Sequence, residues 1–273
     1  MLCFICTTNF FFPLVDSPYL QGRIGVSYVL SDLYAKGVSH CDFVLMLLAV
    51  YRDMTPSNAT ICTCEMVHGF NNACLDAGTV VTRGQTLVNL WPVIRGVTMT
   101  IYCEGKYVRS DGDCVHDVVV LTKPLGIQVV VNVHEWQRGG TTKWREIEDR
   151  VILSVKDSKD MMHVACCLVA RLNQNAGRRM VKYHAHAGTD VTGFGLVGHA
   201  QNLMDNQIEE VGLEIHTLPC ISNTVKIEMA KTLGGLLTCM SNDNAVLYMK
   251  ELKELAGEPS WIIGRVLQIP GGR

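Results

Sequence analysis

The sequence predicts a mixed α/β protein made of two lobes, and three observations support this prediction. The chain has 273 residues, which is long for one hydrophobic core and sufficient for two α/β lobes. Hydrophobic residues make up 48% of the sequence and charged residues 18%, a composition typical of folded chains. Segments with helical periodicity alternate with short apolar segments typical of strands, and no low-complexity linker separates them.

The charge distribution argues against several classes of partner. The net charge is −2, from 24 basic and 26 acidic residues mixed along the chain. The sequence contains no stripe of basic residues of the kind that indicates nucleic-acid binding. The most apolar stretch, residues 43–51, is far shorter than the roughly 20 residues of a membrane-spanning helix. We therefore expect neither a nucleic acid nor a membrane as a partner.

The twelve cysteines are scattered through the chain. Two close pairs, Cys3 with Cys6 and Cys62 with Cys64, have no partner pair at zinc-finger spacing. In a chain of this length, scattered cysteines are more often reduced, half-buried hydrophobic residues than parts of a disulfide framework. We therefore expect a reducing, cytoplasmic location.

The predicted N-terminal lobe, residues 1–124, opens with an apolar segment that we interpret as a buried strand. Ser17-Pro18 marks the start of a helix, because a capping hydroxyl precedes a proline at the first helical position. Gly37 marks its end. Further along, the pattern predicts a fully buried strand over 42–51, a helix over 65–77 and a strand over 92–103.

The predicted C-terminal lobe covers residues 125–273, with the Pro-Gly segment 122–126 as the hinge. Short strands are predicted on either side of this hinge, at 118–121 and 129–133. The remaining pattern predicts helices over 161–176, from about Gly193 and over 244–256, and strands over 211–215, 235–240 and 261–267.

Asp190 is the first candidate for chemistry, in the run Thr189-Asp-Val-Thr-Gly-Phe-Gly195. A carboxylate before glycines that open a helix is suited to hold the Mg²⁺ that accompanies a phosphate group. The motif is neither a Walker loop nor a dinucleotide fingerprint. An ordinary helix cap explains the pattern about equally well.

Asp32 is the second candidate, because it interrupts an apolar helical segment about one turn from its end. The helix dipole disfavours an acid there, which indicates a metal ion or a basic partner. A solvent-facing acid on an amphipathic helix explains the pattern about equally well.

Weaker candidates lie in two polar segments and among the histidines. Thr82–Thr86 is interpreted as a polar turn before a strand, and Thr7-Thr8-Asn9 ends the first strand, where α/β proteins place ligand contacts. The spacing of His184, His186 and His199 fits no compact metal site, so we interpret them as structural.

Several of these motifs, taken in order, resemble the selenophosphate synthetase (selenide, water dikinase) family over about residues 7–267. They are Thr7-Thr-Asn-Phe-Phe-Phe-Pro-Leu-Val-Asp16, Gly22-Arg-Ile24, Leu30-Ser-Asp-Leu-Tyr-Ala-Lys-Gly37, Leu121-Thr-Lys-Pro-Leu-Gly126 and the Asp190 run. The resemblance implies the two-lobe fold shared with aminoimidazole ribotide synthetase. In that fold an N-terminal sheet lobe forms a homodimer and a C-terminal α/β lobe covers the nucleotide.

The resemblance also implies a reaction and its site residues. ATP, selenide and water give selenophosphate, AMP and phosphate, with Mg²⁺, and K⁺ as a further ion. Asp32 and Asp190 correspond to metal-binding aspartates. The positions that match nucleotide contacts are Thr8, Asn9, Gly84, Gln85 and Thr86.

The chain departs from the family pattern at several points. The family's catalytic Cys or selenocysteine and a nearby Lys would lie before residue 1, so no catalytic residue is assigned and we expect this chain alone to be inactive. Asn9 stands where the family has Asp, Tyr28 where it has Asn and Arg83 where it has Gly, and Leu233 departs from a Thr-Ser-Gly-Gly segment. Two alternatives stay open: a diverged dimeric scaffold that binds a nucleotide or a partner without catalysis, and another ATP-dependent superfamily member acting on a purine or thiamine precursor.

Overall fold

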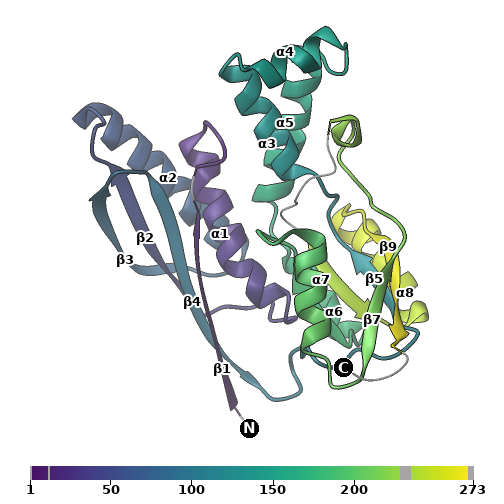
Figure 1. Cartoon of the computed structure of the whole chain (residues 1–273). Coiled ribbons are helices and arrows are strands. Elements are labelled where there is room, and N and C mark those ends of the chain that lie inside the picture. The colour runs from purple at the N-terminus through teal and green to yellow at the C-terminus, as the bar shows by residue number, and fades with distance from the viewer. Residues whose placement is uncertain (1, 12, 228–234, 270–273) are drawn as a thin grey trace. The chain divides into compact units, whose positions relative to one another are not determined.

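The computed structural model describes residues 2–11, 13–227 and 235–269 (Figure 1). It divides into two compact units, of which the first contains residues 1–108 and 170–181 and the second residues 109–169 and 182–273. The two lobes predicted from the sequence, residues 1–124 and 125–273, are proposed domains. The compact units are a different division, and they do not test that boundary.

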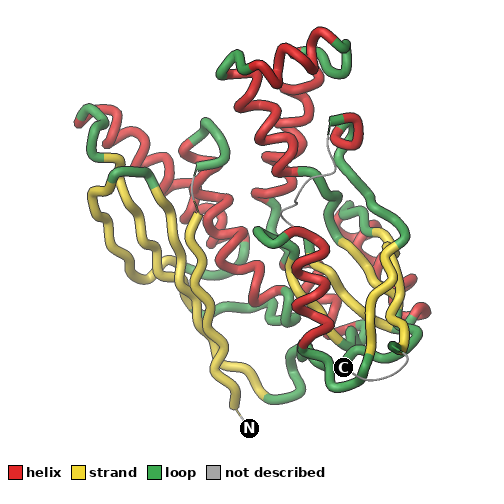
Figure 2. Tube along the Cα trace, in the orientation of Figure 1, coloured by secondary structure: helices red, strands yellow, loops and turns green. Residues whose placement is uncertain are grey.

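The first unit is a four-stranded sheet with helices on one face, as the yellow strands and red helices of Figure 2 show. The strand order is β1-β4-β2-β3; β4 is antiparallel to β1 and β2, and β3 is parallel to β2. Helix α1 packs on β1 and β4, and α2 packs on α1 and β2. The elements are β1 (Leu2–Phe11), α1 (Pro18–Tyr34), β2 (Phe43–Tyr51), α2 (Pro56–Asp76), β3 (Val81–Asn89), β4 (Val93–Cys103) and α6 (Gln174–Lys182).

Strand β1 is half-exposed, so the prediction of a buried strand was wrong in this respect. Its side chains alternate between the two faces of the sheet. The odd-numbered residues 3–9 lie on the face that α1 covers and are partly buried, whereas the even-numbered residues 2–10 are exposed. Helices cover only one face of this sheet, which leaves the even-numbered side chains without a covering layer within the unit.

Both long helices of the first unit begin with the same capping signal. The Ser17 hydroxyl accepts a hydrogen bond from the Leu20 amide at 3.3 Å, which confirms the predicted start of α1. The Thr55 hydroxyl accepts one from the Asn58 amide in the same way, and Pro56 follows it. Helix α2 therefore begins well before the predicted residue 65.

Glycines allow α1 and α2 to pack closely. A Cβ atom on Gly69 would lie 1.9 Å from the backbone oxygen of Tyr19, and one on Gly22 would lie 2.1 Å from that of Met66. These are backbone contacts, so no side-chain rotation could relieve them. The close approach of the two helices fixes the position of α1, and with it Asp32, on the sheet.

The second unit contains a five-stranded antiparallel sheet in the order β6-β8-β5-β9-β7. One hydrophobic core forms where Leu196, Ala200 and Leu203 of α7 join buried strand residues such as Leu121 and Leu237. The elements are β5 (Val118–Leu121), α3 (Ile127–Arg138), α4 (Thr142–Asp149), α5 (Val155–Ala170), β6 (Ala187–Asp190), α7 (Gly195–Asp205), β7 (Val211–Ile215), the short 3₁₀ helix η1 (Thr224–Lys226), β8 (Leu236–Met240), α8 (Asn242–Ala256) and β9 (Trp261–Gln268).

Three further predicted elements differ from the structure. Residues 129–133, predicted as a strand, lie in α3, whose first residues follow Gly126 in a left-handed conformation (φ 109°). Short apolar runs of β-branched residues do not distinguish a strand from a buried helix. The segment 82–86 lies within β3 instead of forming a turn, and the predicted helix 161–176 covers the end of α5 and the start of α6.

Two global expectations can be compared with the structure. Among the described helices, none combines the length and the apolar character needed to cross a membrane. All twelve cysteines are free thiols, in line with the expectation that they form no disulfide framework.

The glycine contact between α1 and α2 predicts the effect of a single methyl group. Gly69→Ala should lower the free energy of unfolding by about 1–3 kcal/mol, because the new Cβ forces two backbones apart. This loss should exceed the helix-propensity gain of up to ~1 kcal/mol. Urea denaturation measures it, with Asn71→Ala at an exposed position of the same helix as the control. A Gly69→Ala protein as stable as the control would contradict the packing described.

Candidate functional site

Asp32 is held by two side chains of β1. It lies near the end of α1, and its Oδ2 atom accepts hydrogen bonds from the Thr7 hydroxyl and from Asn9 Nδ2, the latter at 2.7 Å. Asn9 Nδ2 also donates to the backbone oxygen of Tyr28 at 3.3 Å. The sequence indicated a metal ion or a basic partner for this acid. The structure gives it two neutral donors, and it forms no ion pair with any residue in the described part of the chain.

The chemistry of this cluster suits a hard cation. A carboxylate, a hydroxyl and an amide lie together where β1 meets α1, and each carries an oxygen of the type that Mg²⁺ prefers. Asn9 turns its amide nitrogen toward Asp32 and donates a hydrogen bond to the carboxylate, so this hydrogen bond forms without an ion. A half-turn of the amide would present Asn9 Oδ1 beside the carboxylate instead.

Thr8 lies on the opposite face of β1 from Thr7 and Asn9. Its side chain is exposed, and its hydroxyl donates to the Gly96 backbone oxygen at 3.4 Å. The structure therefore brings Asn9 and Asp32 together and does not bring Thr8 to them. Thr7 takes that place. The alternation of side chains along a strand, counted from Asn9, is the signal that would have identified it.

Gly84, Gln85 and Thr86 lie on β3, at the sheet edge opposite β1, and are exposed. The strand pairings place Asn9, Gly96, Met46 and Gly84 in one row across the sheet. Asn9 and Gly84, at the two ends of this row, are three strand spacings apart, which is about 14 Å. These three residues therefore form a separate part of the candidate site.

Asp190 is the last residue of β6 and belongs to the second unit. It is 7% exposed, and its backbone pairs with Leu236 of β8. The N-cap of α7 is Phe194, which makes no side-chain capping bond, and the helix begins at Gly195 with φ 72°. Asp190 is thus not a helix cap, and the ordinary explanation of its motif fails.

The loop after Asp190 is held by His199. The ring Nε2 atom of His199 lies 3.1 Å from the Thr192 hydroxyl, and its ring lies 5.4 Å from that of Phe194, centroid to centroid. His199 is buried, whereas Phe194 is 72% exposed. The backbone amide of Val191 also donates to the Gly235 oxygen at 2.8 Å. These contacts fix the backbone between Asp190 and α7.

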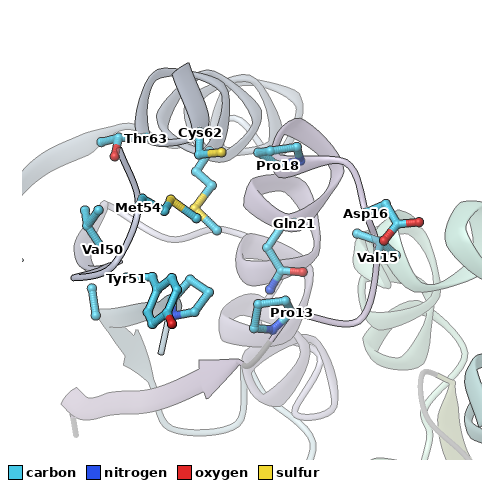
Figure 3. A pocket seen from close by; sticks show the side chains of 13 residues that line it. Pro13, Val15, Asp16, Pro18, Gln21, Val50, Tyr51, Met54, Cys62 and Thr63 are labelled. Carbon is cyan, nitrogen blue, oxygen red and sulfur yellow. The ribbon is translucent and has the colours of Figure 1, made fainter. Parts of the chain in front are cut away.

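An apolar pocket lies near the start of both long helices, and Figure 3 shows side chains from several segments around it. None of the seven predicted site residues lines this pocket, so it is separate from the Asp32 cluster. Its lining residues are Pro13, Val15, Asp16, Pro18, Gln21, Ala49, Val50, Tyr51, Met54, Cys62, Thr63, Met66 and Pro92.

The departures from the family pattern can be located in part. Tyr28 lies on α1, where its backbone oxygen accepts the hydrogen bond from Asn9. Arg83 lies on β3 with an exposed side chain. Leu233 lies outside the described residues. Asn9 therefore lies in the Asp32 cluster, and Tyr28 contacts it through its backbone oxygen.

Family models match almost the whole chain. The model described as AIR synthase related protein, N-terminal domain, matches residues 3–105, and the corresponding C-terminal domain matches residues 115–272. A selenide, water dikinase of Dictyostelium discoideum is 43% identical and aligns over 96% of this chain and 75% of its own length. The corresponding protein of Trypanosoma brucei brucei is 40% identical, over 99% and 72%. Human selenide, water dikinase 2 is 39% identical, over 97% and 62%.

Solved structures share the fold at low sequence identity. Thiamine monophosphate kinase from Aquifex aeolicus has a TM-score of 0.72 at 17% identity and aligns over 97% of this chain and 85% of its own. The hydrogenase maturation protein HypE in complex with ATP has a TM-score of 0.72 at 14% identity, over 98% and 78%. Both domain models match in order, and curated relatives match over most of their length; the chain therefore belongs to the selenide, water dikinase family and has the AIR synthase-like fold.

Proposed function

We propose that the protein containing this chain is a selenide, water dikinase. It converts ATP, selenide and water into selenophosphate, AMP and orthophosphate. The observation that carries this proposal is the cluster in which Asp32 is held by Thr7 and Asn9, on a chain of this family. A location in the cytoplasm is supported by the twelve free thiols, which suit a reducing compartment.

The residues at Asp32 fit a magnesium ion by the chemistry of their donors. Asp32 supplies the carboxylate, and Thr7 and Asn9 supply a hydroxyl and an amide oxygen. When bound, Mg²⁺ neutralises charge on the phosphates of ATP during phosphoryl transfer. Asn9 is a neutral ligand where the family has an acid, so this chain contributes one negative charge fewer here.

Asp190 is proposed as a second metal-binding aspartate. Its carboxylate lies at the end of β6, and the contacts of Val191 and His199 hold the following loop in place. Gly84, Gln85, Thr86 and Asn9 are proposed to contact the nucleotide, whereas Thr8, on the opposite face of β1, is not assigned this role. Gly84 has no side chain and lies on an edge strand, where a ligand can approach the backbone closely.

The reaction can be followed directly by phosphorus NMR. The full-length protein, kept anaerobic with ATP, Mg²⁺ and selenide, should form AMP, orthophosphate and selenophosphate in equal amounts. Asp190→Ala should lower the rate by at least ~100-fold, as expected for loss of a group that stabilises charge. Asp160→Ala, at an exposed position of α5, is the control and should keep full activity.

Two outcomes would contradict the proposal. ATP that stays intact when selenide is present would favour the alternative of a dimeric scaffold without catalysis. An Asp190→Ala protein with the rate of the control would exclude the metal role of that residue. Thermal denaturation of each variant verifies that it is folded.

We also propose that the first unit forms a homodimer through the uncovered face of its sheet. The exposed side chains of β1 on this face include Leu2, Phe4 and Phe10, which are 69%, 66% and 52% exposed. Ile101 of β4, 60% exposed, is the strand partner of Phe4 and continues the apolar surface. A contiguous apolar face of this kind is typical of a protein interface.

The dimer proposal predicts a change in mass. Phe4→Glu should convert the dimer to a monomer in analytical ultracentrifugation, because it places a charge within the exposed apolar face, next to Ile101. Ile61→Glu is the matched control, since Ile61 is equally exposed, at 60%, but lies on α2. A wild-type monomer, or a dimer that persists in the Phe4→Glu protein, would contradict the proposal.

A further inference from the structure

A cysteine, an aspartate and a histidine converge in the second unit, within a part of the chain that the proposed reaction does not use. Cys114 and Asp117 lie in the loop before β5, and His186 directly precedes β6. Their ligand atoms all lie within 4.8 Å of one another. His186 Nδ1 is 2.7 Å from Asp117 Oδ2, and the Cys114 backbone amide donates to the same oxygen at 3.1 Å.

We propose that Cys114, Asp117 and His186 form a binding site for a divalent transition-metal ion, with Zn²⁺ as the best match. Sulfur, carboxylate oxygen and imidazole nitrogen are the ligands that Zn²⁺ takes in proteins. Bonds of about 2.0–2.3 Å in a tetrahedron place the ligand atoms roughly 3.3–3.8 Å apart. The observed limit of 4.8 Å therefore requires a small movement of the side chains, and the 2.7 Å contact between His186 and Asp117 must lengthen when an ion binds.

The backbone fixes this loop against the sheet. A Cβ atom on Gly112 would lie 2.8 Å from the His186 oxygen, so the glycine permits the close approach of the two segments. The His186 amide donates to the Cys239 oxygen at 2.9 Å, and the Asp117 oxygen accepts from the Val266 amide at 2.7 Å. Two of the ligands are thus attached to neighbouring strands and need little ordering when an ion binds.

A buried acid lies directly beside the site. Asp113, one residue before Cys114, is 2% exposed, and neither of its carboxylate oxygens accepts a hydrogen bond from a nitrogen or oxygen donor. Burial raises the pKa of Asp113 to about 7, an effect that the nearby Cys239 thiol opposes and the charge of Asp117 increases. An adjacent cation would favour the charged form of this group.

The same residues resemble a Cys-His-Asp nucleophile, but the electrostatics oppose that function. Burial and the charges of Asp117, Glu209 and Asp113 raise the pKa of the Cys114 thiol. A reactive cysteine needs a lowered pKa, because the thiolate is the nucleophile. The carboxylates around this thiol also favour a cation at this place. A bound metal would displace the thiol proton and release it to solvent.

Cobalt binding tests the site without relying on enzyme activity. Protein stripped by a chelator and supplied with excess Mg²⁺, but no ATP, should bind one equivalent of Co²⁺ and develop thiolate-to-cobalt charge-transfer absorption. Zn²⁺ should displace the cobalt. Cys114→Ser should abolish the absorption, and His186→Ala should weaken binding at least tenfold. Cys114 is exposed, so its substitution should leave the fold intact, as circular dichroism would verify.

Cys167 provides the matched control. It is also exposed, and its Sγ atom lies 3.8 Å from His163 Nε2 on the same helix, but it is not part of any three-ligand group among the described residues. Cys167→Ser should therefore leave the absorption unchanged. Absence of the absorption in the wild-type protein would overturn the proposal, as would its loss in the Cys167→Ser protein or its persistence in the Cys114→Ser protein. None of these outcomes depends on the dikinase activity.

Discussion

The antiparallel pairing of β1 with β4 determines which side chains can reach Asp32. Because this register turns the odd-numbered residues of β1 toward α1, Thr7 and Asn9 meet the carboxylate and Thr8 does not. A shift of one residue would exchange the two sets. The same register places Phe4 and Phe10 on the uncovered face, so one strand supplies the candidate cation site on one side and the candidate dimer surface on the other.

The substitution at Asn9 has a definite electrostatic consequence. Two carboxylates at the observed separation of 2.7 Å would repel each other unless a cation lay between them. With an amide at position 9, the pair forms a hydrogen bond and is stable without an ion. The proposed cation site is therefore held together by hydrogen bonds without an ion, and it carries one negative charge fewer than a pair of aspartates would.

Sequence patterns identified the fold and most of the strands, and they missed features that depend on tertiary contacts. Of the predicted site residues, the structure brings Asn9 and Asp32 together, which the sequence could not show. The start of α1 followed from Ser17-Pro18, because capping is a local interaction. The helix over 129–133 could not be identified, because a β-branched apolar run suits a buried helix as well as a strand. Thr7 could be preferred to Thr8 as a partner of Asp32 only once it was known which face of β1 meets α1. The cluster at Cys114 could not be predicted from the sequence, because it depends on contacts between segments about 70 residues apart.

The central claim is that Asn9 and Asp32 act as one unit in binding the cation that accompanies the nucleotide. A double-mutant cycle of Asn9→Ala and Asp32→Ala, measured as the Kd of ATP in the presence of Mg²⁺ by titration calorimetry, tests this claim most directly. Each substitution should weaken binding, and the double variant should bind ATP little worse than the weaker-binding single variant. Additive effects on the free energy of binding would show that the two residues act independently, and would contradict the account.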